Sequence, residues 1–108
     1  MRQTNLVPAK LFFPGRVVAT PGALEALDAA EPIAETPADH LSLSMRLLSR
    51  HLSGDWGDLD DFDKRQNDEA IRLNNRIFSA YVLSTGVKVW VITEADRSAT
   101  TFLLPEEY

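Results

Sequence analysis

An acidic segment, residues 54–61, gathers the residues with the clearest capacity for chemistry, four aspartates and a tryptophan. Closely spaced carboxylates can bind Ca²⁺, so we compared the segment with an EF-hand loop. Counted from Asp58, Asp60 and Glu69 fall where an EF-hand carries acidic ligands, but Asp63 stands where the loop needs glycine to turn. These carboxylates also precede a helical pattern, where they stabilise the positive end of a helix dipole. We therefore predict no metal site and no cofactor for this chain.

A second charged segment, residues 93–98, places two carboxylates and Arg97 in a predicted loop between strands. If this loop meets the acidic segment, the carboxylates supply acid–base groups and Arg97 binds an anion. The alternative is structural: Arg97 pairs with a carboxylate of its own turn, and Trp56 covers the edge of the core with its N–H hydrogen bonded. The sharpest prediction is that the turn at residues 55–58 packs near Arg97. The candidate binding residues are Asp55, Trp56, Asp58, Glu94, Asp96 and Arg97.

No familiar catalytic pattern accompanies these charges. The chain has no cysteine, which excludes disulfides, a thiolate nucleophile and cysteine-containing zinc sites. His40 and His51 lie on one predicted helix about 16 Å apart, so they cannot share a metal within one subunit. His51 is instead predicted to interact with the carbonyl end of that helix. Neither a Gly-x-Ser-x-Gly motif nor a phosphate-binding glycine loop is present, so we assign no catalytic residue and lean away from an enzyme.

Start signals, stop signals and periodicity predict an α+β domain. Thr20-Pro21 marks a helix start, because a hydroxyl caps the helix and proline presets φ in its first turn. After Arg76 the apolar period changes to two, which predicts a C-terminal three-stranded meander. We expect about three helices packed on a small antiparallel sheet, with a strand at residues 16–19 at an edge of the meander. The predicted helices span residues 22–30, 37–52 and 60–74, the meander strands span 77–83, 87–93 and 99–104, and residues 11–13 are extended.

Two of these helices carry apolar stripes that predict their buried faces. The second helix is apolar beyond one stripe, so it is either buried on two sides or offers surface to a partner. Its stripe comprises Leu41, Met45, Leu48 and Leu52, with Leu43 and Leu47 outside it. The stripe of the third helix comprises Leu59, Phe62, Gln66, Ala70 and Leu73.

Length, charge and composition limit the classes of function. A chain of 108 residues forms one domain, which we place at residues 11–108 after a flexible arm at residues 1–10. Its net charge of −5 argues against direct binding of duplex DNA and favours basic partners. No apolar run reaches the length of a membrane span, and residues 1–8 lack the apolar core of a secretory signal. We therefore expect a cytoplasmic protein without membrane partners.

Four segments stand out in order along the chain: FPGRVVATPGAL at residues 13–24, HLSGDWGDL at 51–59, WVITEADRS at 90–98 and LLPEEY at 103–108. Together they resemble a family of small plasmid-related bacterial proteins that plasmids and integrative elements carry. The resemblance covers nearly all of the chain from residue 12 onward. It implies a mobile-element origin and association with antirestriction or other defence-evasion genes, and it implies no catalytic residues.

These observations favour a non-enzymatic accessory protein that binds another protein, such as a host defence factor or a nucleic-acid-binding factor. The alternative is a small enzyme or ligand-binding domain with its site between the turn at residues 55–58 and the loop at residues 94–98. A homodimer through the edge of the meander or through the second helix is a third prediction. One version of the first is a DNA mimic, although a net charge of −5 is low for that role. The carboxylates of such a mimic would be Asp55, Asp58, Asp60, Asp61, Asp63 and Glu69.

Overall fold

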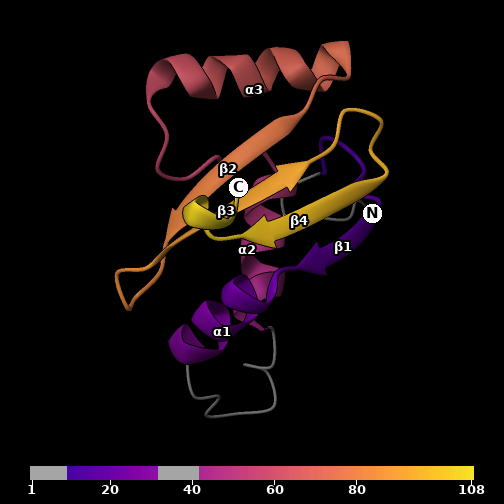
Figure 1. Ribbon diagram of the computed structural model, residues 1–108. Coiled ribbons are helices and arrows are strands. Elements are labelled where there is room, and N and C mark those ends of the chain that lie inside the picture. Colours follow the sequence, from indigo (N-terminus) through magenta and orange to yellow (C-terminus); the bar gives the residue numbers. More distant parts are fainter. Residues whose placement is uncertain (1–9, 32–41) are drawn as a thin grey trace, which may run out of the picture.

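The computed structural model describes residues 10–31 and 42–108, which form three helices and a four-stranded mixed sheet. The predicted α+β class and the C-terminal three-stranded meander are confirmed (Figure 1). The strands lie side by side in the order β1-β4-β3-β2. In chain order the elements are β1 (Arg16–Ala19), α1 (Pro21–Ala30), α2 (Leu43–Leu52), α3 (Asp61–Leu73), β2 (Ile77–Val82), β3 (Lys88–Thr93), β4 (Ala99–Leu103) and the 3-10 helix η2 (Pro105–Glu107).

The first strand, β1, makes the sheet mixed rather than antiparallel. It pairs in parallel with β4, so that Arg16 lies opposite Ala99. A parallel partner needs a long connection, and here three helices and two strands separate β1 from β4 along the chain. The strand predicted at residues 16–19 therefore lies at an edge of the meander, as expected. Residues 11–13, predicted to be extended, form no strand.

Local signals fix the ends of the helices. Thr20 caps α1 by accepting a hydrogen bond from the N–H of Ala23 at 3.1 Å. Asp60 caps α3 through the N–H of Asp63 at 2.8 Å, and Asn74 ends that helix in the left-handed conformation at φ 57°. None of the helices described is long and apolar enough to cross a membrane.

The second helix, α2, packs on the inner face of the sheet through Leu48 and Leu52 of the predicted stripe and through neighbouring residues outside it. It buries Leu47, His51 and Leu52, whereas Met45 is 55% exposed. A hydropathy pattern predicts that histidine lies on the solvent side of a helix. Here hydroxyl groups of the sheet form hydrogen bonds with both ring nitrogens of His51, so the face of the helix around it can be buried. The helix follows the cap Ser42, and the start signal predicted at residues 36–39 lies outside the described residues.

The main core fills the space between this inner face and the helices α1 and α2; in Figure 1, α2 lies behind the sheet and α1 lies below it. Alternate residues of the strands point into it, as the period of two requires. Its largest buried members are Leu27, Leu47, Tyr81, Leu83, Val89, Val91 and Phe102.

The third helix, α3, lies along the edge strand β2 (Figure 1). It buries Asn67 and Ala70, while Phe62 and Leu73 of the predicted stripe are 61% and 52% exposed. The predicted stripe is confirmed for Ala70 and wrong for Phe62 and Leu73, because the edge of a strand offers hydrogen-bonding groups and Asn67 contacts them. An apolar pattern cannot identify such a face.

The chain's own residues cover the outer edge of β2. The side-chain amide of Asn67 donates to the carbonyl of Phe78 at 2.6 Å and accepts from its N–H at 3.1 Å. Two residues further along, Ala80 donates to the carbonyl of Trp56 at 3.1 Å and accepts from the N–H of Asp58 at 2.6 Å. Unpaired strand edges invite association with other chains, so this cover protects the sheet.

Candidate functional site

The acidic turn at residues 55–58 thus lies against the sheet edge, and its carboxylates pair with cations of the same chain. Asp55 Oδ2 lies 2.7 Å from Nε of Arg50, and Asp58 Oδ2 lies 3.1 Å from Nζ of Lys88. The hydrogen bond from Arg50 is the main cause that lowers the pKa of Asp55 below its ordinary value. Within the described part of the chain, no three His, Asp or Glu side chains gather into a group that could hold a metal ion.

Arg97 holds the loop between β3 and β4 against the end of α3. Its guanidinium donates hydrogen bonds to the carbonyls of Asn75 at 2.7 Å and Ala70 at 3.0 Å. It also donates to the carbonyls of Glu94 and Ala95 in its own loop, both at 3.2 Å. The Ala70 carbonyl already accepts the backbone N–H groups of Asn74 and Asn75, so Arg97 adds a further donor at the end of α3 and ties the loop to it. Its bonds are therefore those of a structural clamp.

The two charged segments meet through an aromatic ring. Phe12 stacks on Trp56 with ring centroids 6.3 Å apart, and the guanidinium carbon of Arg97 lies 5.7 Å from the centroid of Phe12. The predicted packing of the turn near Arg97 thus holds for Trp56, through the intervening ring. It is wrong for the carboxylates of Asp55 and Asp58, which have other partners.

The remaining candidates also have partners of their own. Asp96 accepts a hydrogen bond at 2.9 Å from the backbone N–H two residues later, and Glu94 Oε1 lies 3.9 Å from Nε of Arg76. Trp56 is 4% exposed and its indole N–H donates to Asp68 at 3.1 Å, so its predicted place at the core edge is confirmed. The structure therefore distributes the six candidate residues over several contacts and does not bring them into one site.

A buried chain of hydrogen bonds links α2 to the sheet. His51 is fully buried, with Nδ1 2.6 Å from Oγ of Ser79 and Nε2 2.9 Å from Oγ1 of Thr93. Thr93 Oγ1 lies 2.6 Å from Oγ1 of Thr100, whose hydroxyl donates to the carbonyl of Pro14 at 2.7 Å. Because Thr100 donates to Pro14, Thr93 donates to Thr100. His51 therefore donates from Nε2 to Thr93, and when the ring is neutral its Nδ1 accepts from Ser79.

Burial, rather than the hydrogen bonds themselves, keeps the imidazole neutral. Burial lowers the pKa of His51 to about 3, so the ring carries no charge at neutral pH. The prediction that His51 interacts with the carbonyl end of its helix is wrong, because the ring turns toward the sheet instead. A sequence signal for the network exists: the small hydroxyl residues Ser79, Thr93 and Thr100 stand at inward positions of their strands.

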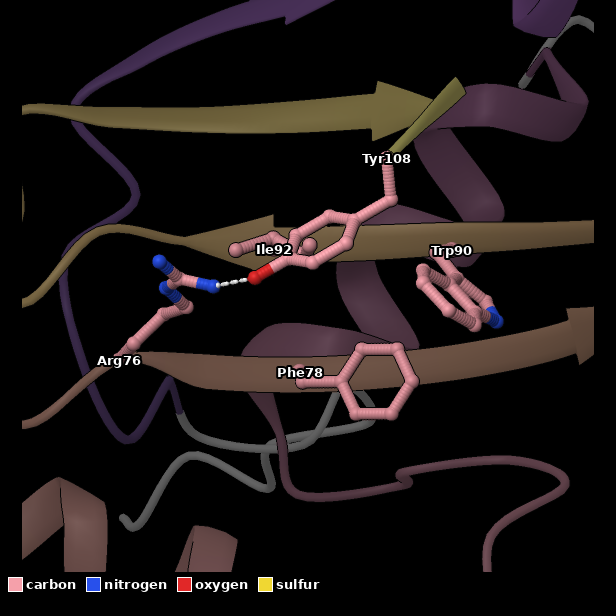
Figure 2. Close-up of a pocket in the computed structure, with 5 residues that line it drawn as sticks. All are labelled: Arg76, Phe78, Trp90, Ile92 and Tyr108. Carbon is pink, nitrogen blue, oxygen red and sulfur yellow. Dashed lines mark hydrogen bonds between the residues drawn. The ribbon is translucent and has the colours of Figure 1, made fainter. Parts of the chain in front are cut away.

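The outer face of the sheet, opposite α1 and α2, carries a groove of about 280 Å³ (Figure 2). Phe78, Trp90 and Ile92 point to this face because their neighbours along the strands point into the core. The rings of Phe78 and Trp90 meet edge to face at 4.9 Å, and those of Trp90 and Tyr108 at 5.7 Å. Tyr108 reaches this position because η2 packs against β3 and directs the following residue over it. The residues that line the groove are Arg76, Phe78, Trp90, Ile92 and Tyr108.

Arg76 provides a positive charge at one end of the groove. Its guanidinium donates a hydrogen bond to the hydroxyl of Tyr108, drawn in Figure 2, and lies 5.7 Å from the centroid of that ring. The same hydrogen bond raises the pKa of Arg76 above its ordinary value. Trp90 is half-buried and Tyr108 is 70% exposed. The groove therefore combines accessible aromatic surface with one positioned cation.

None of the five groove residues is among the candidates that the sequence suggested. Strand alternation alone could have placed Phe78, Trp90 and Ile92 on one face, and the register pairs Phe78 with Ile92 and Ala80 with Trp90. No local sequence pattern predicts that Tyr108 lines the groove, because its position depends on how η2 packs on the sheet.

Comparison of the chain with protein-family models, with curated proteins and with solved structures found no match. The function is accordingly inferred from the chemistry of the groove and of the surfaces around it.

Proposed function

We propose that this is a non-enzymatic binding protein whose partner, another protein, docks on the outer face of the sheet. The groove lined by Phe78, Trp90 and Tyr108 carries the proposal, because it leaves aromatic surface and a charged arginine accessible. Trp, Tyr and Arg are the residues that most often dominate the binding energy of protein interfaces. Aromatic side chains also bury a large area while few rotatable bonds become fixed, so binding through them costs little entropy.

The alternative of a small enzyme or ligand-binding site between the two charged segments has less support. Asp55 and Asp58 are paired with Arg50 and Lys88, and Arg97 donates to four backbone carbonyls. A general acid or base must reach the substrate with a proton to exchange, and ion-paired carboxylates at a sheet edge are poorly suited to that task.

Two other predicted modes of action also have less support. A DNA mimic needs unpaired carboxylates, yet Asp55, Asp58 and Glu69 each form a salt bridge. A homodimer through the β2 edge of the meander would have to displace the hydrogen bonds that Asn67 and the acidic turn make there.

The partner we propose is a host defence factor or a nucleic-acid-binding factor, encountered in the cytoplasm. The resemblance to plasmid-related proteins suggests this setting, in which a mobile element gains from blocking restriction. The net charge of −5 suits a partner that is basic overall, because long-range attraction raises the rate of encounter. Local contacts in the groove would then determine which partner stays bound.

The proposal is tested by site-specific photo-crosslinking in cells that carry the element. p-Benzoylphenylalanine replaces Val82, which is 55% exposed and shares the outer face of β2 with Phe78, or Phe62, which is 61% exposed on α3. We expect a discrete crosslinked protein from the Val82 position and none from the Phe62 position. The purified partner should bind the wild type at least tenfold more tightly than Trp90→Leu.

A control variant and a cellular assay complete the test. Met45→Ala, at an exposed site on α2, should bind as the wild type does. The plating efficiency of unmodified phage on a restricting host should rise with the wild type and not with Trp90→Leu. A partner that crosslinks from α3 and binds Trp90→Leu normally would disprove docking on the outer face.

A further inference from the structure

We infer that the groove receives a single aromatic side chain of the partner, with a carboxylate next to that ring bound by Arg76. The inference rests on the proposed function and names the chemistry that the groove recognises. An aromatic residue followed by an acidic one in a partner segment would meet both requirements.

The groove has room for an aromatic ring. Its volume of about 280 Å³ lies just below the range of roughly 300–1,000 Å³ typical of pockets for drug-sized ligands. Ile92 is 5% exposed and forms part of an apolar lining, while Phe78 and Trp90 present ring edges and faces. Aromatic rings prefer edge-to-face or offset contacts with other rings, so this lining favours an aromatic group over an aliphatic one of similar size.

Tyr108 shows how the groove holds a ring and an oxygen together. Its ring meets Trp90 edge to face at an interplanar angle of 67°, and its hydroxyl oxygen accepts a hydrogen bond from Arg76. Figure 2 shows the hydroxyl directed at the guanidinium while the ring stays over the sheet. A second ring placed between Tyr108 and Phe78 would find the same cation at the same end of the groove.

Arg76 has donors left for such an oxygen. A guanidinium carries five N–H donors, and among the described residues Arg76 donates one hydrogen bond, to Tyr108. Its distance of 3.9 Å to Glu94 exceeds hydrogen-bond length, and both side chains are about half exposed, so this ion pair is weak. A carboxylate can therefore displace Glu94 and bind in the bidentate geometry that arginine favours.

Electrostatics disfavour two other occupants. A lysine or arginine of the partner would be repelled by the guanidinium, although aromatic groups alone can attract cations. Single-stranded nucleic acid stacks on aromatic residues, but it also needs a positively charged track for its phosphates. A chain with a net charge of −5 and one arginine in the groove does not provide such a track.

Three dipeptide probes separate the contributions of the ring and the charge. The probes are acetyl-Phe-Glu-amide, acetyl-Leu-Glu-amide, which lacks the ring, and acetyl-Phe-Lys-amide, which reverses the charge. Binding is followed by NMR through the two indole N–H signals of the full chain. Trp90 lies in the groove, whereas Trp56 is 4% exposed with its N–H bonded to Asp68, so it serves as an internal control.

We expect acetyl-Phe-Glu-amide to shift the Trp90 signal in a saturable manner and to leave the Trp56 signal in place. Each of the other two probes should bind at least tenfold more weakly. Arg76→Gln should reduce the preference for Phe-Glu over Phe-Lys to less than twofold. The matched control is Arg72→Gln, because Arg72 is an exposed arginine paired with Glu69 on α3, away from the groove, and this variant should keep the full preference.

Equal binding of the three probes, a shift of Trp56 in place of Trp90, or an unchanged preference in Arg76→Gln would overturn the inference. An unmoved Trp56 signal in Arg76→Gln shows that this variant is folded. If crosslinking from Val82 persists while no dipeptide binds, the ligand class is wrong and the proposed function stands. If the dipeptides bind as expected while that crosslink is absent, the proposed function is wrong and the recognition of an aromatic–acidic pair stands.

Discussion

His51 on α2 and Ser79 on β2 are joined by a hydrogen bond of 2.6 Å inside the core, although 28 positions separate them in the chain. The bond belongs to a chain of hydroxyl groups around an imidazole that burial keeps neutral. The folded protein therefore excludes a proton that the unfolded chain binds readily. This difference makes the stability of the fold depend on pH.

The first prediction concerns acid. The pKa of His51 is about 3 in the folded state and about 6.5 in the unfolded state, so the unfolded chain binds the proton first as the pH falls. Stability is therefore full above about pH 6.5 and decreases below it, until the folded state also binds the proton near pH 3. Between pH 7 and pH 5 the free energy of unfolding should fall by about 2 kcal/mol. Urea unfolding in a His40→Gln background, which leaves His51 as the only histidine, measures this change.

His51→Gln is the control for that prediction. It removes the titrating group, so the variant should be less stable at pH 7 but nearly independent of pH between 7 and 5. A variant that keeps the wild-type pH dependence would show that another group is responsible.

The second prediction concerns Gly57, whose backbone lies against Ala80. Gly57 has φ +77°, and a Cβ there would lie 2.0 Å from the carbonyl oxygen of Ala80. Gly57→Ala should therefore lower the free energy of unfolding by about 2–4 kcal/mol, through backbone strain and a steric clash at the sheet edge. Gly86→Ala is the matched control, because Gly86 has φ +91° but open space around the Cβ position. It should cost about 1 kcal/mol. Equal losses in thermal unfolding would contradict the clash.

The third prediction concerns the cover of β2. Asn67→Ala leaves the N–H and carbonyl of Phe78 without their partner, which should cost about 1–3 kcal/mol. The amide hydrogen of Phe78 should also exchange faster with solvent. Asn75→Ala, at an exposed position just after the same helix, should leave both quantities nearly unchanged. Unaltered exchange at Phe78 in Asn67→Ala would show that the edge does not depend on this side chain.

The fourth prediction separates the acidic turn from the groove. Asp55→Asn and Asp58→Asn remove salt bridges whose side chains are about half exposed, so each should cost no more than about 1 kcal/mol. Because Arg50 keeps Asp55 charged, any contribution of this pair is present above the ordinary pKa of Asp55 and is lost as the pH falls through its lowered folded value. Crosslinking from Val82 should be unaffected by either substitution. Loss of this crosslink in both variants would indicate that the binding site lies at the acidic turn.

The sequence by itself determined the strands of the meander and the ends of α1 and α3. Thr20, Asp60 and Asn74 act through hydrogen bonds to residues within one helical turn. Their effect can therefore be predicted without knowledge of the rest of the fold. The period of two after Arg76 likewise identifies the meander, because strand alternation is a property of the local backbone.

Only the tertiary structure determined which faces of those elements pack together and which surfaces they form jointly. Hydropathy could not predict that His51 and Asn67 are buried, because each is buried against a polar partner on a distant strand. Charge could not predict that Arg97 would bind carbonyls at the end of α3, because both the donor and its acceptors are positioned by the packing of separate elements. The groove arises in the same way. Phe78, Trp90 and Tyr108 form one surface only after β2, β3 and η2 have come together, and no short stretch of sequence contains that contact.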